Sequence, residues 1–330
     1  MATGKASDLK VYNPQIQAGL IETLAQISDV FNTASRNCIR LVANRRPGNY
    51  VYEAFWQNPS GLITRRDTTS VSAADDIAMT QEEEISVKLN RKIGPVAQTL
   101  DAFRKIGARA DENALDFTIG TQIAKAMQVE MCDTALLATR AALLNQAACL
   151  YTVPTNGTLN TAGLVSGLAK RGDRATDVAC WVMHSKPYYD LVAAQITANI
   201  DGVSNFNVAT ATPVTLNRPV LVTDSPSLIV TSGTSNTPIT DYITLGLAPG
   251  AVTVEDSEEE YVARFIETGK ENLIVRVQGE FAYTLKQKGF KWDVSTGGAN
   301  PASSAVGTGS NWDKVAADMK DLGGVVIKSR

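Results

Sequence analysis

The sequence predicts an α+β protein. A long helical stretch without proline, from about residue 111 to residue 146, separates two groups of strand-like segments. The first group covers residues 50–56 and 85–100, and the second begins at residue 252. Residues 150–251 mix short helices with short apolar strands. Strands that are grouped, and do not alternate regularly with helices, are typical of α+β folds.

The N-terminal region joins a polar start to an amphipathic segment. Residues 1–12 show no periodic apolar pattern and predict a loose tail. From residue 13 to about residue 33, apolar side chains recur every three or four residues, which is the spacing of one helix face. These side chains are Ile16, Leu20, Leu24, Ile27 and Phe31. The pattern fits an ordinary surface helix as well as an arm that binds a partner.

Residues 46–85 predict an extended β-hairpin. A turn at residues 46–49 precedes the segment 50–56, which is rich in strand-forming residues, and a second turn follows at residues 58–61. Residues 62–80 are polar, so few apolar positions alternate on either arm of the hairpin. A segment that can bury so little of itself needs a neighbour in order to become ordered.

The charges of this region are segregated. Residues 1–66 carry a net charge of +4, and residues 67–84 carry six acidic residues and no basic one. A solvated loop explains this pattern, and so does a two-signed surface that pairs with an adjacent subunit. The acidic cluster at residues 255–260 is a candidate partner for the basic residues. The candidate inter-subunit contacts are Arg45, Arg46, Arg65, Arg66, Asp75, Asp76, Glu82, Glu83, Glu84, Glu258, Glu259 and Glu260.

The helix at about 111–146 begins with acidic residues, which suit the positive end of the helix dipole. At 1.5 Å per residue it would be roughly 55 Å long, far longer than an average helix of about 11–12 residues. A helix of this length has to run across a domain as a strut. A coiled coil is the alternative, but the apolar residues keep no clean heptad.

The rest of the chain predicts short helices and strands. Apolar runs at 177–183, 219–224 and 242–247 predict buried strands, and the pattern predicts helices at 161–170 and 188–196. Further strands are expected at 252–255, 272–285 and 289–292. The C-terminal region predicts a loop at 295–312, a short helix near 312–319 and an edge strand at 323–328.

Composition and motifs argue against several classes of protein. The net charge of −3 gives no basic excess for tight nucleic-acid binding. Four cysteines without a CxxC pair and one histidine make a zinc site unexpected. The start of the sequence lacks the apolar core of a signal peptide, no apolar run reaches about 18 residues, and reduced thiols in the cytosol are expected. We therefore expect no catalytic residues, no cofactor, no metal and no contact with a membrane.

One pair of residues suggests an alternative enzymatic function. His184 follows Cys180 by four residues, which is compatible with a thiol hydrolase. Cys180 lies within an apolar run that is expected to be buried, whereas a reactive thiolate needs an exposed, electropositive setting. Termination of a strand is the simpler role for His184.

Several phrases, in this order, resemble the major capsid proteins of tailed bacteriophages, which have the Hong Kong 97-type fold. The phrases are Trp181–Leu191, Arg218–Ser225, Leu245–Ala251, Gly289–Asp293, Asn300–Ser303 and Asn311–Val315. The resemblance covers nearly the whole chain. It implies an N-terminal arm at 1–45, an extended loop at 46–85, a peripheral domain at 86–149 with a spine helix at about 111–146, an axial domain at 150–251, terminal strands of the peripheral domain at 252–293, and a C-terminal tail at 294–330.

The resemblance also implies a function. The chain would self-assemble, as pentamers and hexamers, into an icosahedral head that encloses double-stranded DNA through weak, non-specific contacts. Portal, scaffold or decoration proteins would be its partners, the virion its location and the host cytoplasm its place of assembly. Some members of the family form crosslinks through a lysine of the extended loop. Because this sequence has no lysine between Lys10 and Lys88, we expect no such crosslink.

Two further alternatives remain open from the sequence. A cellular nanocompartment shell of the encapsulin type shares the same fold, and the genes next to the coding sequence would separate the two. A secreted β-rich adhesin is suggested by the Thr-, Asn- and Ser-rich residues 204–240, although the missing signal peptide argues against it.

Overall fold

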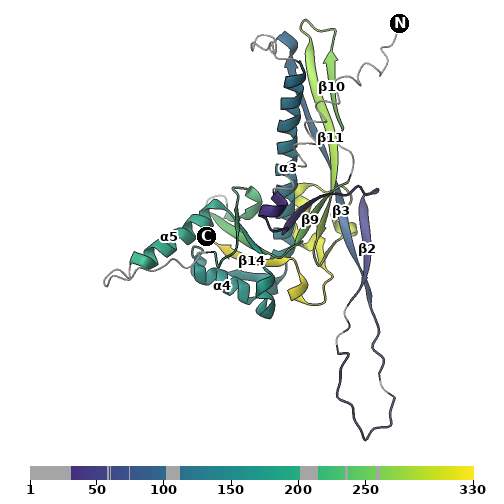
Figure 1. The fold of residues 1–330 in the computed structure, drawn as a ribbon, viewed down its shortest axis with the longest axis vertical. Helices are drawn as coiled ribbons and strands as arrows, with labels where there is room; N and C mark the ends of the chain where they lie inside the picture. Colours follow the sequence, from purple (N-terminus) through teal and green to yellow (C-terminus); the bar gives the residue numbers. More distant parts are fainter. Residues whose placement is uncertain are drawn as a thin grey trace.

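The computed structural model describes residues 31–57, 59, 61–73, 75–101, 112–200, 215–234, 237–257 and 261–330. Within them, two six-stranded sheets share a core with one long helix, α3 (Glu112–Leu144). The predicted arm lies outside the described residues as far as residue 30, and residues 31–34 are helical. The first sheet and α3 form an upright body, from which the second sheet and its helices extend to one side (Figure 1).

The first sheet has the strand order β1-β9-β11-β3-β2, and β10 pairs with β11. β1 runs parallel to β9, and the other neighbours are antiparallel. Its strands are β1 (Ile39–Ala43), β2 (Tyr50–Trp56), β3 (Gln81–Thr99), β9 (Val252–Asp256), β10 (Tyr261–Glu267) and β11 (Ile274–Gln287). The predicted hairpin is confirmed, because β2 pairs with residues 81–87 of β3.

Helix α3 has 33 residues, so it is about 50 Å long. The predicted single helix at about 111–146 is confirmed apart from its ends. Its C-terminal half is rich in buried alanine, including Ala135, Ala138 and Ala142, and the helix contacts β9 and β11 of the first sheet and β14 of the second. Small side chains allow both sheets to approach the helix closely. The Tyr283 hydroxyl donates a hydrogen bond of 3.0 Å to Thr134 and ties β11 to the helix.

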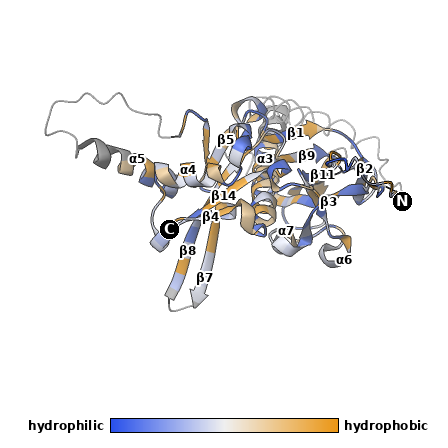
Figure 2. Ribbon diagram, turned by 90° about the horizontal axis from the view of Figure 1, so that it is seen from below, coloured by the Kyte–Doolittle hydropathy of each residue, from blue (hydrophilic) through white to orange (hydrophobic). Residues whose placement is uncertain are grey.

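The second sheet has the order β4-β14-β8-β5-β6, and β7 pairs with β8. Its strands are β4 (Leu150–Thr152), β5 (Cys180–Met183), β6 (Val220–Val222), β7 (Ile229–Thr234), β8 (Thr237–Leu247) and β14 (Gly324–Ser329). Helices α4 (Thr161–Ala169) and α5 (Ser185–Ile200) accompany this sheet. The hairpin of β7 and β8 projects beyond the rest of the sheet (Figure 2).

The C-terminal region differs from three of our predictions. The expected loop at 295–312 contains two short helices, α6 (Val294–Gly297) and α7 (Ser303–Val306). The helix predicted near 312–319 is wrong, because β13 (Trp312–Lys314) pairs with β12 (Phe290–Trp292). The buried rings of Trp292 and Trp312 meet there edge to face, with centroids 4.9 Å apart. This packing outweighs the local helical preference.

The final strand is also placed differently from the prediction. β14 was expected at an edge, yet it lies between β4 and β8. Five of its six residues are buried. The segment assigned to a C-terminal tail therefore completes the sheet that is formed by residues from the region 150–251. Apolar content alone did not distinguish an edge strand from a central one.

Candidate functional site

The extended loop, residues 57–80, joins β2 to β3. It reaches far from both sheets, at the end of the molecule opposite the β10–β11 hairpin (Figure 1). All of its described residues from 61 to 80 are exposed. Ile63 is 97% exposed and Leu62 is 66% exposed. Apolar side chains in water on a protrusion are typical of a surface that another molecule covers.

The base of the hairpin is held by a charge network across four strands and the segment before β2. Arg46 lies 2.7 Å from the Glu53 carboxylate and 3.0 Å from that of Glu255. Lys286 forms ion pairs with Glu53 and, at 3.1 Å, with Glu84. The network connects β2 and β3 to β9 and β11, so it sets the direction in which the extended loop leaves the first sheet.

The charges of this network shift the pKa of its members. A hydrogen bond from Lys286 is the largest cause that lowers the pKa of Glu53, and Arg46 adds to it. Burial by itself would lower the pKa of Lys286, but its bonds to Glu53 and the charge of Glu84 raise it. The ion pairs are therefore present at neutral pH.

The replacement Glu53→Gln tests the contribution of this network to stability. Because the folded state lowers the pKa of Glu53 below 4.5, its contribution is present above that pH and is lost as the pH falls through the folded-state pKa. We expect the difference in unfolding free energy between wild type and Glu53→Gln to be constant above about pH 5 and to shrink below it. Urea unfolding at a series of pH values measures this difference, and a difference that does not change with pH would contradict the assignment. Asp75→Asn, in the extended loop, is the matched control.

The predicted contact residues occupy several different settings. Arg65, Arg66, Asp75 and Asp76 are exposed in the extended loop. Arg46 and Glu84 belong to the network at its base, where their described ion pairs are within the chain. Glu82 and Glu83 begin β3, opposite residues 54 and 55 of β2, and Arg45 lies between β1 and β2. Glu258, Glu259 and Glu260 lie outside the described residues. A contact between any of them and another subunit stays a prediction.

A groove that the sequence did not reveal lies toward the opposite end of the first sheet. It has a volume of about 560 Å³ and runs between α3 and β3. Its apolar lining comes from Ile93 and Val96 on β3 and from Ile119 and Ile123 on α3. An ion pair of 2.7 Å between Arg91 and Glu130 lies at its border. Nothing in the sequence indicated that this part of α3 is only partly covered.

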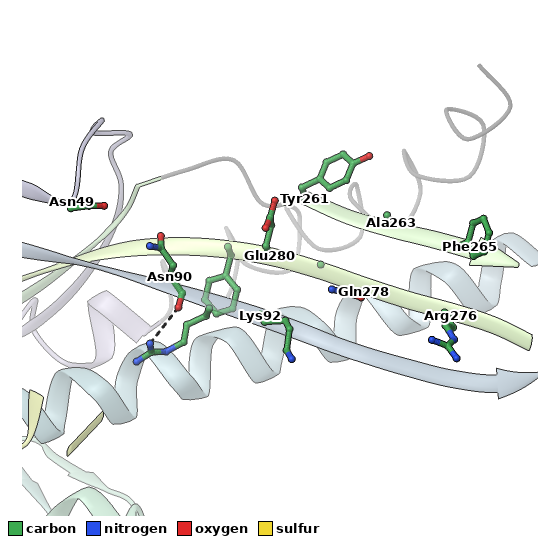
Figure 3. Close-up of a pocket in the computed structure, with 12 residues that line it drawn as sticks. Asn49, Asn90, Lys92, Tyr261, Ala263, Phe265, Arg276, Gln278 and Glu280 are labelled. Carbon is green, nitrogen blue, oxygen red and sulfur yellow. Dashed lines mark hydrogen bonds between the residues drawn. The ribbon is translucent and has the colours of Figure 1, made fainter. Parts of the chain in front are cut away.

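The other face of the same strands carries a hollow of about 890 Å³ (Figure 3). Strand register places Tyr261, Glu280 and Lys92 side by side on this face, and Phe265 opposite Arg276. The hollow therefore combines exposed aromatic rings with charges of both signs. It contains no arrangement of nucleophile, base and orienting group.

The arrangement around Cys180 does not support a thiol hydrolase. The thiol is 1% exposed, and a hydrogen bond with Cys38, together with burial, raises its pKa. His184 accepts a hydrogen bond from the backbone of Lys186, and its Nε2 lies 3.7 Å from Asp224. A thiol with a raised pKa in the core is a poor nucleophile.

The described part of the chain also bears on metal binding and membrane spanning. It contains no group of three or more metal-ligating side chains. None of its helices is both long and apolar enough to cross a membrane.

The two sheets, the long helix and the extended loop together have the fold of solved phage capsid proteins. A chain from the capsid of cyanophage Pam1 superposes with a TM-score of 0.52 at 11% identity, over 88% of each chain. Chains from the capsid of Ralstonia phage GP4 (13% identity, 90% of this chain and 88% of that chain, TM-score 0.48) and from Microbacterium phage Oxtober96 (14%, 89% and 90%, 0.48) are also similar. The predicted α+β capsid fold is confirmed.

The family described as Gp13-like, major capsid protein 13-like, matches residues 8–326, and the chain belongs to this family. It is therefore a major capsid protein, a structural protein of the phage head. A weaker similarity links 180 residues, 51% of this chain, to the arginine biosynthesis bifunctional protein ArgJ of Zea mays at 25% identity. The match spans only 34% of that protein.

Proposed function

We propose that this chain self-assembles into the icosahedral head of a tailed bacteriophage, around double-stranded DNA, and that it has no catalytic activity. The observation that carries the proposal is the family match over residues 8–326. The extended loop supports it, because its exposed apolar and charged residues need a second copy of the chain to cover them. The family match also favours a phage head over a nanocompartment, an adhesin or a thiol hydrolase.

In this proposal the parts of the chain have separate roles. Residues 1–45 are an arm and residues 46–85 an extended loop, both of which reach a neighbour. Residues 86–149 and 252–293 form the peripheral domain, in which α3 is the spine. Residues 150–251 form the axial domain of pentamers and hexamers, and residues 294–330 supply β14 to its sheet.

The partners follow from the same proposal. Portal, scaffold or decoration proteins meet the shell, assembly occurs in the host cytoplasm, and the mature protein resides in the virion. A net charge of −3 suits an inner wall that holds DNA weakly. A crosslink through the extended loop is not expected, because the nearest lysine after it, Lys88, is 3% exposed and donates a hydrogen bond of 3.0 Å to the Arg46 carbonyl.

Electron microscopy of the purified recombinant protein tests the proposed function. We expect closed shells of uniform size, and a denaturing gel of these shells should show one band at the subunit mass of 35.3 kDa. A chain that stays monomeric at high concentration, with and without a coexpressed scaffold, would refute self-assembly. A ladder of multiples of the subunit mass would refute the absence of crosslinks.

A further inference from the structure

Two buried thiols from different sheets meet in the core. Cys38 immediately precedes β1 and is fully buried, and Cys180 begins β5 and is 1% exposed. Both belong to the apolar cluster that connects the two sheets. They are far apart in the sequence, so tertiary packing alone brings them together.

The carbonyl of Leu247 marks the place where they meet. It accepts a hydrogen bond of 3.4 Å from the Cys38 thiol and one of 2.8 Å from the backbone of Ala179. Cys180 lies directly opposite Leu247 in the ladder between β5 and β8. The Cys38 carbonyl also accepts a hydrogen bond of 3.3 Å from the backbone N–H of Val252, which fixes the position of the Cys38 backbone. Cys38 and Cys180 therefore both neighbour one residue of β8.

Each of the two cysteines also changes the pKa of the other. A hydrogen bond with Cys180 lowers the pKa of Cys38, and the same contact, together with burial, raises the pKa of Cys180. The other two cysteines lack such a neighbour in the described interactions. Burial and the charge of Asp133 raise the pKa of Cys132, and the charged groups near Cys149 are basic residues.

We propose that Cys38 and Cys180 are a latent disulfide site that joins the two sheets once the protein meets an oxidising medium. The thiols are reduced in the structure. A low-molecular-weight disulfide, such as oxidised glutathione, is the oxidant. The biological role rests on the proposed function, because a phage particle leaves the reducing cytoplasm of its host when the cell lyses.

The reaction balances as two thiol–disulfide exchanges. The Cys38 thiolate attacks one sulfur of oxidised glutathione and forms a mixed disulfide, and the first glutathione leaves and takes up a proton. Once local opening exposes Cys180 to solvent, its thiol loses a proton and the thiolate attacks the Cys38 sulfur, which expels the second glutathione as a thiolate that takes up a proton. Two protein thiols are oxidised, and one glutathione disulfide is reduced to two thiols.

Burial sets the rate of this reaction. A glutathione molecule cannot reach either sulfur in the closed core, so oxidation requires local opening between the sheets. The disulfide should therefore form slowly in buffer and faster in a low concentration of urea. Once formed, it closes a long loop of the unfolded chain, and the melting temperature should rise by on the order of 5–10 °C.

The experiment incubates the purified full-length protein with oxidised glutathione, with and without dilute urea, and maps disulfides by mass spectrometry. We expect a linked peptide pair containing Cys38 and Cys180 and a loss of two hydrogens from the intact mass. Cys180→Ala should abolish the link and the rise in melting temperature, whereas Cys132→Ala should keep both.

Other outcomes would overturn the proposal. These are glutathione on Cys132 or Cys149 without the Cys38–Cys180 link, a different pairing, or a link that leaves the melting temperature unchanged. The wild-type map needs no variant to fold. The result does not depend on shells either, so a failure here is distinguishable from a failure of self-assembly.

Discussion

Replacement of both Arg65 and Arg66 by glutamate is expected to prevent shell formation while the subunit stays folded. Both side chains are exposed in the extended loop, so reversal of their charge removes no contact from the core. An exposed ion pair contributes only about 0.2–1 kcal/mol. A shell repeats the contact in every subunit, and we expect the yield of shells to fall by at least about tenfold. Electron microscopy and sedimentation measure the yield.

The conservative variant Arg65→Lys/Arg66→Lys is the matched control, and it should assemble because it keeps both charges. Circular dichroism and the melting temperature of the glutamate variant should match those of wild type. Replacement of Glu258–Glu260 by lysine in the glutamate variant should restore assembly if those residues are the partners. Normal shells from the glutamate variant alone would exclude the contact.

The replacement Ala138→Pro is expected to have the largest effect on stability. Ala138 is fully buried in α3, and this helix contacts both sheets. Proline removes one helical hydrogen bond and clashes with the preceding turn, which costs about 3 kcal/mol or more. The break would also disturb the packing of the two sheets on the helix. Urea unfolding and the yield of soluble protein measure the loss.

A second replacement of Ala138 distinguishes the effect of breaking the helix from the effect of changing the side chain. Ala138→Gly keeps the hydrogen bond and should cost only about 1 kcal/mol. Equal stability of the proline variant and wild type would mean that α3 does not act as one continuous rod between the sheets.

Helices and strands whose sequence patterns involve residues close together in the chain were predicted well. The helix at 111–146 was found as α3 because its hydrogen bonds join residues four apart and its apolar spacing repeats locally. The hairpin was found for a similar reason, since two turns and a strand-forming run lie close together. The buried strand at residues 177–183 appears as β5, which is shorter but wholly buried.

Elements that depend on distant partners were missed. β1, β7 and β10 were not predicted, and each is stabilised by pairing with another strand: β1 with β9, β7 with β8 and β10 with β11. The mixture of charges at the base of the extended loop was visible in the sequence. The assignment of Arg46 to Glu53 and Glu255, however, required the first sheet to be assembled.

The sequence by itself determined the fold class, the long helix, the exposed loop and the resemblance to phage capsid proteins, because these depend on composition, short-range periodicity and the order of segments. Only the tertiary structure decided that β14 lies inside the second sheet, that an apolar groove opens beside α3, and that Cys38 meets Cys180. Each of these results from packing between residues that are far apart in the chain. The free energy of that packing depends on which surfaces are buried together. A local sequence pattern does not identify the surface against which a segment will pack.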